Sequence, residues 1–367
     1  MKSLNNVINN KSISYMKAIT SIFVIMLRLL TIFIILFVTH AASAEFSSEV
    51  LLEKLAEAKD YLGVQPSNSS KILKKYLNEI DQLSINNQLT WHQNLLRASI
   101  SLNDLKQVES TVRLMLAYPE LETETDKFVS LLSSLGIFLR RSGYPQESIW
   151  LFDCGLNQGI KNYKQKISLL ISKATSLKYL KKYSQAKATF AHALQLAKQH
   201  NDEIFIGSIY NSLGNMAIIE EEYILAKEYL INALQVSQKI SRRTGQIIAG
   251  LQLLMLSILD NDLILYDKLH YRISRLTLMS DSETRHAYLF WIEKAHQVSK
   301  GKELSAEEQE ELVVKLYFIK IVSVNLHNQL VEKLAKPMGI KILPIVKEYS
   351  QYKGDLLNHI HQCKLSK

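Results

Sequence analysis

The stretch Gly207–Leu234, GSIYNSLGNMAIIEEEYILAKEYLINAL, decides the fold of this chain. Small and apolar residues recur in it at helical spacing on both sides of three consecutive glutamates. The positions are Leu213, Gly214 and Ala217 before the glutamates, and Ala226, Leu230 and Ala233 after them. This pattern predicts two amphipathic helices joined by a short turn, with small side chains where the helices cross closely.

The same pattern returns along the chain at steps of 40, 38, 40 and 40 residues. Equivalent positions are Val108, Ser148, Ala186, Ala226 and Tyr266. A regular period of this size is typical of α-solenoids, in which helical hairpins stack and bury faces that none could bury alone. Only 12 glycines and 5 prolines occur in 367 residues, which favours long helices and short loops. We therefore predict an all-α fold.

The repeats resemble the tetratricopeptide repeat. The positions that carry the resemblance are Gly136, Ala174, Ala186, Phe190, Gly214, Tyr223, Ala226 and Ala233. The period of 38–40 residues is longer than the family's usual length of about 34, and the family's terminal proline is absent from the two best copies. The resemblance implies a right-handed α-solenoid that binds a protein or a peptide.

The repeats divide the chain into regions of different regularity. Residues 45–84 form a degenerate hairpin, 85–280 the repeat solenoid, and 281–367 a C-terminal helical cap or a docking region for a partner. Ser305 and Glu308 predict a capping box at a helix start. After Pro344 we expect a final helix that runs to about His361.

Residues 1–44 differ chemically from the rest of the chain. They are basic, with no acidic residue before Glu45, and an apolar run, Leu29–Val38, precedes Ala42 and Ala44. This order is typical of a secretory signal peptide, with cleavage before Glu45. We expect an exported protein in the periplasm of a Gram-negative bacterium.

The alternative is that Ser21–Val38 remains as an uncleaved membrane anchor, with the protein attached to the inner membrane and facing the periplasm. Arg28 lies inside that stretch, where a charge costs about 2.5 kcal/mol or more at the bilayer centre. The charge favours cleavage over retention.

Charge and motifs exclude several functional classes. Loss of residues 1–44 removes four positive charges from the formal +9 and leaves +5, too little to indicate a nucleic-acid partner. The sequence has no glycine-rich phosphate loop, no His-Glu-x-x-His motif and no paired-cysteine zinc spacing. We therefore predict no enzyme activity, no metal and no cofactor.

The resemblance places a concave groove along the first helices of the repeats. Side chains that can hydrogen-bond a peptide backbone gather at these positions; the alternative is that they only solvate the surface. The candidate groove residues are Arg141, Ser172, Thr175, Lys178, Tyr179, Asn211, Asn215 and Gln252.

Nine lysines and no acidic residue lie between Cys154 and Asn201. Such a segment could attract an anionic glycan or lipid, or it could simply solvate outer helix faces. The candidate basic patch is Lys161, Lys164, Lys166, Lys181 and Lys182.

Cys154 and Cys363 are the two cysteines, too few for a disulfide framework. Cys154 is expected to be a small buried residue within a repeat, and its pairing with Cys363 stays open. The leading hypothesis is an exported, non-enzymatic adaptor that binds a protein. A membrane-anchored sensor and a binder of anionic glycan or lipid are the alternatives.

Overall fold

The computed structural model describes residues 47–63, 65–345, 351–361 and 363–365, together with Met26 and Tyr349. Apart from Met26, the predicted signal peptide and its cleavage site lie outside the described residues. Two compact units divide the chain, the first ending at Trp91 and the second beginning at His92.

The first unit contains a short helical hairpin. Its elements are α2 (Ser48–Tyr61), α3 (Pro66–Lys75), the 3₁₀ helix η1 (Leu77–Gln82) and the start of α4 (Ile85–Leu102), which continues into the second unit. Leu51, Leu73 and Leu89 are fully buried. The indole nitrogen of Trp91 donates a hydrogen bond to the carbonyl oxygen of Leu73 at 3.0 Å, which ties α4 to α3.

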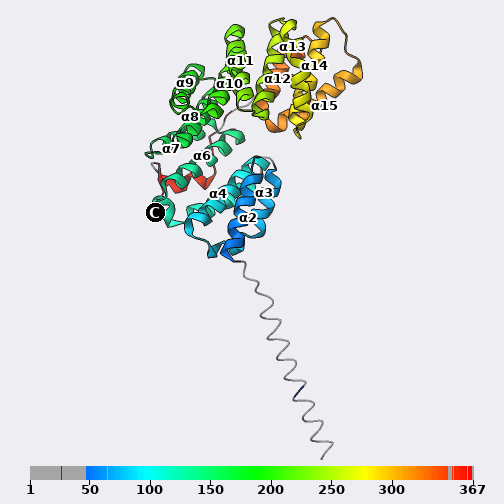
Figure 1. The fold of residues 1–367 in the computed structure, drawn as a ribbon. Coiled ribbons are helices and arrows are strands. Elements are labelled where there is room, and N and C mark those ends of the chain that lie inside the picture. Colours follow the sequence, from blue (N-terminus) through cyan, green and yellow to red (C-terminus); the bar gives the residue numbers. More distant parts are fainter. Residues whose placement is uncertain are drawn as a thin grey trace, which may run out of the picture. The chain divides into compact units, whose positions relative to one another are not determined.

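The second unit is an α-solenoid of consecutive helical pairs (Figure 1). Helices α6, α8, α10, α12 and α14 contact one another in a row, besides contacting their chain neighbours, and so form one layer. The all-α repeat fold is confirmed. Its helices are α5 (Leu105–Leu116), η2 (Pro119–Glu122), α6 (Thr125–Ser142), α7 (Pro145–Leu156), α8 (Tyr163–Tyr179), α9 (Tyr183–Gln199), α10 (Glu203–Ile219), α11 (Tyr223–Lys239), α12 (Arg243–Leu259), α13 (Leu263–Leu278), α14 (Glu283–Ser299), α15 (Ala306–Val322) and α16 (Val324–Leu330).

The 40-residue period consists of two equal helices. Each of α8 to α12 has 17 residues, and each begins 20 residues after the one before. A residue in the left-handed conformation lies in every turn between α8 and α13, and the amide of the residue after it donates to a carbonyl in the last turn of the preceding helix. At one such turn, the amide of Glu222 donates to the carbonyl of Ala217 at 2.8 Å. The left-handed residues are Lys181, Asn201, Glu221, Ser241 and Asn261.

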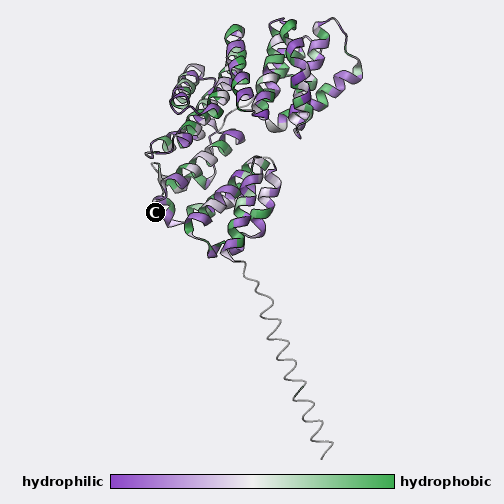
Figure 2. Cartoon of the chain, viewed as in Figure 1, coloured by the Kyte–Doolittle hydropathy of each residue, from purple (hydrophilic) through white to green (hydrophobic). Residues whose placement is uncertain are grey.

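The positions that set the sequence period lie in the core. Val108, Ser148, Ala186 and Ala226 are fully buried, and Tyr266 is 2% exposed. Hydrophobic and hydrophilic residues alternate along most helices, as a half-buried helix requires (Figure 2). Of the resemblance positions, Tyr223 is partly buried, and the buried ones are Gly136, Ala174, Ala186, Phe190, Gly214, Ala226 and Ala233.

Small residues mark close helix crossings. A Cβ atom added to Gly214 would lie 2.6 Å from Cγ of Leu230, and one added to Gly136 would lie 2.5 Å from the ring of Phe152. Real Cβ atoms do not approach that closely. Both glycines are therefore required by packing between the two helices of their pair.

The repeat register extends beyond residue 280. Helix α14 begins 40 residues after α12, and it pairs with α15. The predicted capping box is present at the start of α15, where the hydroxyl of Ser305 accepts from the amide of Glu308. A sixth helical pair thus stands where the sequence suggested only a cap or a docking region.

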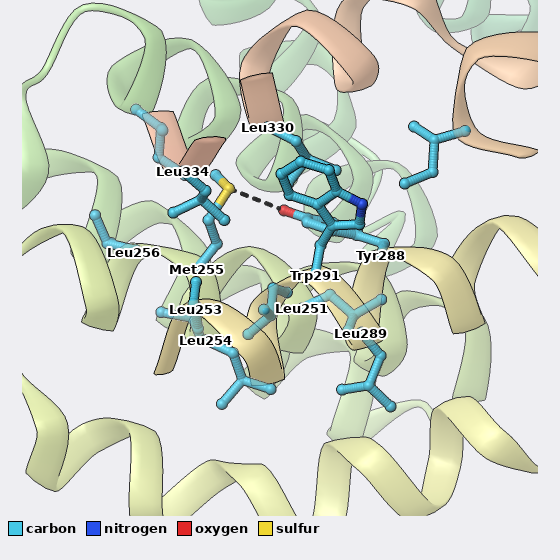
Figure 3. Packing of buried hydrophobic residues seen from close by; sticks show 14 of the residues in the cluster. Leu251, Leu253, Leu254, Met255, Leu256, Tyr288, Leu289, Trp291, Leu330 and Leu334 are labelled. Atoms are coloured by element: carbon cyan, nitrogen blue, oxygen red, sulfur yellow. Dashed lines mark hydrogen bonds between the residues drawn. The ribbon is translucent and has the colours of Figure 1, made fainter. Parts of the chain in front are cut away.

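The described residues between Ser323 and Leu365, called here the return segment, then contact earlier repeats. Helix α16 and the π-helix η3 (Val331–Ala335) insert Leu330 and Leu334 beside Met255, Tyr288 and Trp291 (Figure 3). Further on, the amide of Tyr352 donates to Oε1 of Glu147 on α7 at 2.8 Å. The segment ends with η4 (Asp355–His359) and a hairpin of β1 (Ile360–His361) and β2 (Lys364–Leu365).

The predicted final helix to His361 is therefore wrong. The described residues between Gly339 and Gly354 are not helical. Their polar groups bond to other parts of the chain instead: the side chain of Asn328 bonds both the amide and the carbonyl of Ile345, each at 2.8 Å. Tertiary partners replace the hydrogen bonds that a helix would have supplied.

Candidate functional site

A pocket of about 290 Å³ lies between the layer of first helices and the return segment. We call it the inner pocket. Helices α8, α10, α12 and α14 each line part of it, and residues 323–329 close one side. Its main polar lining residues are Thr175, Lys178, Asn211, Ser212, Asn215, Gln252, Thr284, Arg285, Ser323, Asn325 and Gln329.

The inner pocket brings together six of the eight candidate groove residues. They are Thr175, Lys178, Tyr179, Asn211, Asn215 and Gln252. Their gathering follows from the register, because equivalent turns of α8, α10 and α12 face the same side of the layer. Whether these residues bind a ligand stays a prediction.

Arg141 and Ser172 do not line this pocket. The guanidinium of Arg141 donates to the carbonyl oxygen of Ile100 at 3.0 Å, a contact that links α6 to α4 within the second unit. Ser172 is 8% exposed, and its carbonyl accepts a hydrogen bond from the hydroxyl of Ser176. Arg141 therefore bonds a neighbouring helix, and Ser172 is buried.

A directed chain of hydrogen bonds crosses the floor of the pocket. Nζ of Lys178 donates to Oδ1 of Asn215 at 3.0 Å, and Nδ2 of Asn215 donates to Oε1 of Gln329 at 3.1 Å. The chain connects α8, α10 and α16. It leaves the amide nitrogen of Gln329 as its last donor.

The inner pocket is cationic. Lys178 and Arg285 line it, and no Asp or Glu is among its lining residues. Burial, together with the positive charge of Arg140, lowers the pKa of Lys178 to about 8. Burial also lowers the pKa of Arg140, whose guanidinium lies over the ring of Tyr179, 5.8 Å from its centroid.

Several buried amide atoms at the pocket have no hydrogen-bond partner among the described residues. They are Oδ1 of Asn211, Oε1 of Gln252 and Nε2 of Gln329. The side chains of Gln252 and Gln329 belong to residues only 8% and 6% exposed. A buried polar group without a partner costs about 1–3 kcal/mol, so these atoms are the ones a ligand would satisfy.

A second cavity of about 610 Å³, called here the outer cavity, adjoins the inner pocket. Lys178, Tyr179 and Gln329 line both. Tyr183 on α9 also lines it, and Leu343 and other return-segment residues complete it. Leu343 is 86% exposed and adds an apolar side chain to the rim of this cavity.

Three tyrosines line the outer cavity. Tyr179, Tyr183 and Tyr349 come from α8, α9 and the return segment. Burial is the main cause that raises the pKa values of Tyr183 and Tyr349, so these phenols stay neutral. Lys181, Glu332 and Lys333 supply charges of both signs at the margin, and Lys333 pairs with Glu221.

The candidate basic patch divides into two groups. Lys161, Lys164 and Lys166 lie at the start of α8, whereas Lys181 and Lys182 follow its end. A 17-residue helix is roughly 25 Å long, so the groups do not form one surface. Acidic residues from other helices also approach this segment: Lys164 lies 3.9 Å from Asp202, and Lys173 lies 2.5 Å from Asp153.

Cys154 and Cys363 form a disulfide bond with a Cα–Cα distance of 4.9 Å, which answers the question that the sequence left open. Cys154 is fully buried on α7, as predicted, but as half of a cross-link. The carbonyl of Cys363 also accepts a hydrogen bond from Nε2 of Gln158 at 2.9 Å. The end of the return segment is thus fixed to α7.

Sequence reasoning missed the lining residues contributed by α14 and the return segment. Arg285, Tyr288, Asn325 and Gln329 fall after residue 280, outside the predicted repeats. The 40-residue spacing from Arg243 to Glu283 was the available signal for α14. Nothing in the local pattern placed Gln329 opposite Asn215.

Two searches of the described residues gave negative results. No group of three or more His, Cys, Asp or Glu side chains there is arranged to hold a metal ion. Across the same residues, every helix is too short or too polar to span a bilayer.

No family model and no curated protein matches the sequence. Among solved structures, the chain is similar to BtubC (BKLC) from P. vanneervenii, with a TM-score of 0.46 and 16% identity over 62% of this chain and 90% of that one. It is also similar to a Rap protein in complex with competence and sporulation factor (TM-score 0.49, 12% identity, 80% and 95% coverage). The apo form of RapI gives a TM-score of 0.42 and 14% identity over 79% of this chain and 93% of that one. The sequence identities and TM-scores are too low for these structures to indicate the function of this chain.

Proposed function

We propose that this protein is a non-enzymatic scaffold that binds a segment of a partner protein at the outer cavity. The observation that carries the proposal is the rim of Tyr179, Tyr183 and Leu343, which adjoins the hydrogen-bonding groups of α8 and α10 at the inner pocket. Aromatic side chains are enriched at the centres of protein interfaces, where they supply most of the binding energy. An extended segment could place apolar side chains on this rim and its backbone against the neighbouring polar groups.

Site-specific photo-crosslinking tests the proposal. A photoreactive phenylalanine analogue replaces Leu343 on the outer cavity, and the matched control carries it at Ile224 on α11, which is 88% exposed and lines neither cavity. We expect a discrete crosslinked partner from position 343 and none from position 224. Equal crosslinking from both positions would reject the outer cavity as the binding surface.

A variant of the predicted groove gives an independent measurement. Asn211→Ala combined with Asn215→Ala removes the polar groups next to the cavity without touching its aromatic rim. We expect weaker capture of the same crosslinked partner. Unchanged capture would restrict the binding surface to the outer cavity alone.

We also propose export to the periplasm, with cleavage before Glu45. The Cys154–Cys363 pair supports this location, because disulfides persist in oxidising compartments and are rare in the cytosol. Intact mass and N-terminal sequencing of the mature protein test it. A mature start at Glu45 is expected, whereas retention of residues 21–38 would favour the membrane-anchored sensor.

A further inference from the structure

The inner pocket has a chemistry that a partner segment at the outer cavity does not require. It lies between four helices and the return segment, and its volume of about 290 Å³ is at the lower limit for ligand sites in proteins. The groups that a ligand could satisfy are of three kinds: cations without a counter-ion, unpaired acceptors and an unpaired donor. A ligand that fits must pair with groups of all three kinds.

The cations require an anion. Among the described residues, the guanidinium of Arg285 on α14 has no hydrogen-bond or ion-pair partner, and Nζ of Lys178 donates only to the neutral amide of Asn215. No carboxylate lines the pocket to neutralise either side chain. Hydrogen bonds between a guanidinium and a carboxylate are short and about twice as strong as neutral ones. A carboxylate group on the ligand would supply the missing charge.

The acceptors require a donor on the same ligand. Oδ1 of Asn211 and Oε1 of Gln252 accept no hydrogen bond from any described residue, and both atoms are buried. A simple inorganic anion would satisfy the cations but would leave these oxygens unpaired. An ammonium or amide N–H group would satisfy them.

The remaining donor fits the same ligand. Nε2 of Gln329 is the open end of the chain from Lys178 through Asn215, so its direction is fixed by two hydrogen bonds. It can donate to a carboxylate or carbonyl oxygen. The polar wall is therefore built in advance, with one orientation of each amide in the chain.

We propose that the inner pocket binds a small zwitterion, a free amino acid or a dipeptide, with its carboxylate toward Arg285 and Lys178 and its ammonium toward Asn211 and Gln252. An apolar ligand would leave the amide atoms of Asn211, Gln252 and Gln329 unpaired, and a simple cation would meet two positive charges. The proposal goes beyond the partner segment at the outer cavity. It makes the scaffold a sensor of a small metabolite as well.

Calorimetric titration of the full mature chain tests the proposal, with the standard L-amino acids and a set of L,L-dipeptides as probes. Native mass measurement of the purified protein first identifies any small molecule that remains bound. Each binding compound is then compared with its C-terminal amide and its N-acetyl derivative. We expect at least one free compound to bind, and both derivatives to bind at least about tenfold more weakly, since each loses a charge-assisted hydrogen bond.

Arg285→Gln is the decisive variant, because the side chain is partly exposed and lies outside the buried core. It should weaken binding at least about tenfold. Arg243→Gln, the same change on an exposed residue that lines neither cavity, should leave binding unchanged. Circular dichroism verifies that both variants are folded.

Three results would overturn the proposal. One is that none of the probes binds the wild-type chain and that no bound molecule is found in it. Another is that Arg285→Gln binds as tightly as wild type. The third is that N-acetyl compounds bind as tightly as free ones, which would make the pocket an anion site only. Crosslinking from position 343 is independent of all three, so either proposal can fail alone.

Discussion

Cys154 on α7 and Cys363 near the end of the chain are joined by a disulfide across 209 residues of sequence. The bond fastens the return segment to a repeat that precedes it by four helical pairs. Beside it, the side chain of Gln158 donates to the carbonyl of Cys363, and earlier in the return segment Asp355 pairs with Arg113. The return segment is therefore tied at its far end as well as at α16.

Loss of this disulfide should destabilise the second unit. Cys363→Ser is expected to lower the free energy of unfolding by about 2–4 kcal/mol, because the cross-link restricts a long loop in the unfolded chain. Urea denaturation of the mature protein under oxidising conditions measures the change. Wild type in reductant should match the variant. Two titratable thiols per wild-type chain under oxidising, denaturing conditions would show that the bond is absent.

The same variant should expose the return segment to protease. Lys341 and Lys353 are exposed residues in its non-helical part, and trypsin should cleave there faster in Cys363→Ser than in wild type. Arg113→Gln serves as the comparison, because it removes only exposed ion pairs, to Asp355 and Glu109, which contribute little. Mass spectrometry of the first tryptic fragments locates the cleavage sites in both variants. Equal cleavage in Cys363→Ser and wild type would mean that other contacts hold the segment.

Gly214 should tolerate no larger side chain. Gly214→Ala forces Leu230 to move, and we expect a loss of about 1–3 kcal/mol, although alanine normally favours a helix over glycine. Gly63→Ala is the control, because its added Cβ meets no atom within 4 Å. Thermal denaturation of both variants measures the difference. A Gly214→Ala variant as stable as wild type would contradict the helix crossing described here.

The lowered pKa of Lys178 predicts a pH dependence of stability. Between pH 8 and 10.5 the folded state releases this proton while the unfolded chain still binds it. The unfolding free energy contributed by Lys178 therefore rises with pH through that window, as its buried charge is removed. The measurement is the difference between wild type and Lys178→Met at several pH values. The free energy of unfolding of wild type should rise relative to that of the variant as the pH rises. A constant difference between the two would refute the lowered pKa of Lys178.

Trp291 should be among the most sensitive core positions. It is fully buried between Met255, Tyr288 and Leu330 (Figure 3), and its indole nitrogen donates to the carbonyl of Leu312 at 3.0 Å. Trp291→Ala is expected to cost about 3–5 kcal/mol. Trp150→Ala removes the same side chain where it is 37% exposed and should cost clearly less. Similar losses for the two variants, measured by denaturation, would contradict the packing.

The repeat architecture was readable from the sequence because its physical cause is local and periodic. Val108, Ser148, Ala186 and Ala226 occupy one position of a two-helix unit, and each must be small or apolar wherever that unit recurs. The same register brought Lys178, Asn211, Asn215 and Gln252 to one pocket without knowledge of any coordinates. Periodic burial links position in sequence directly to position in the layer.

What the sequence could not determine depends on contacts between distant residues. The return segment has no apolar period, so its path from α16 to Cys363 follows from individual partners such as Asn215, Glu147 and Cys154. The predicted final helix is absent for this reason, because side chains such as Asn328 and Glu147, 17 and 205 residues away from their partners, bond that backbone. Likewise, only the tertiary structure placed Arg285 and Gln329 opposite the predicted groove and so enclosed it as a pocket.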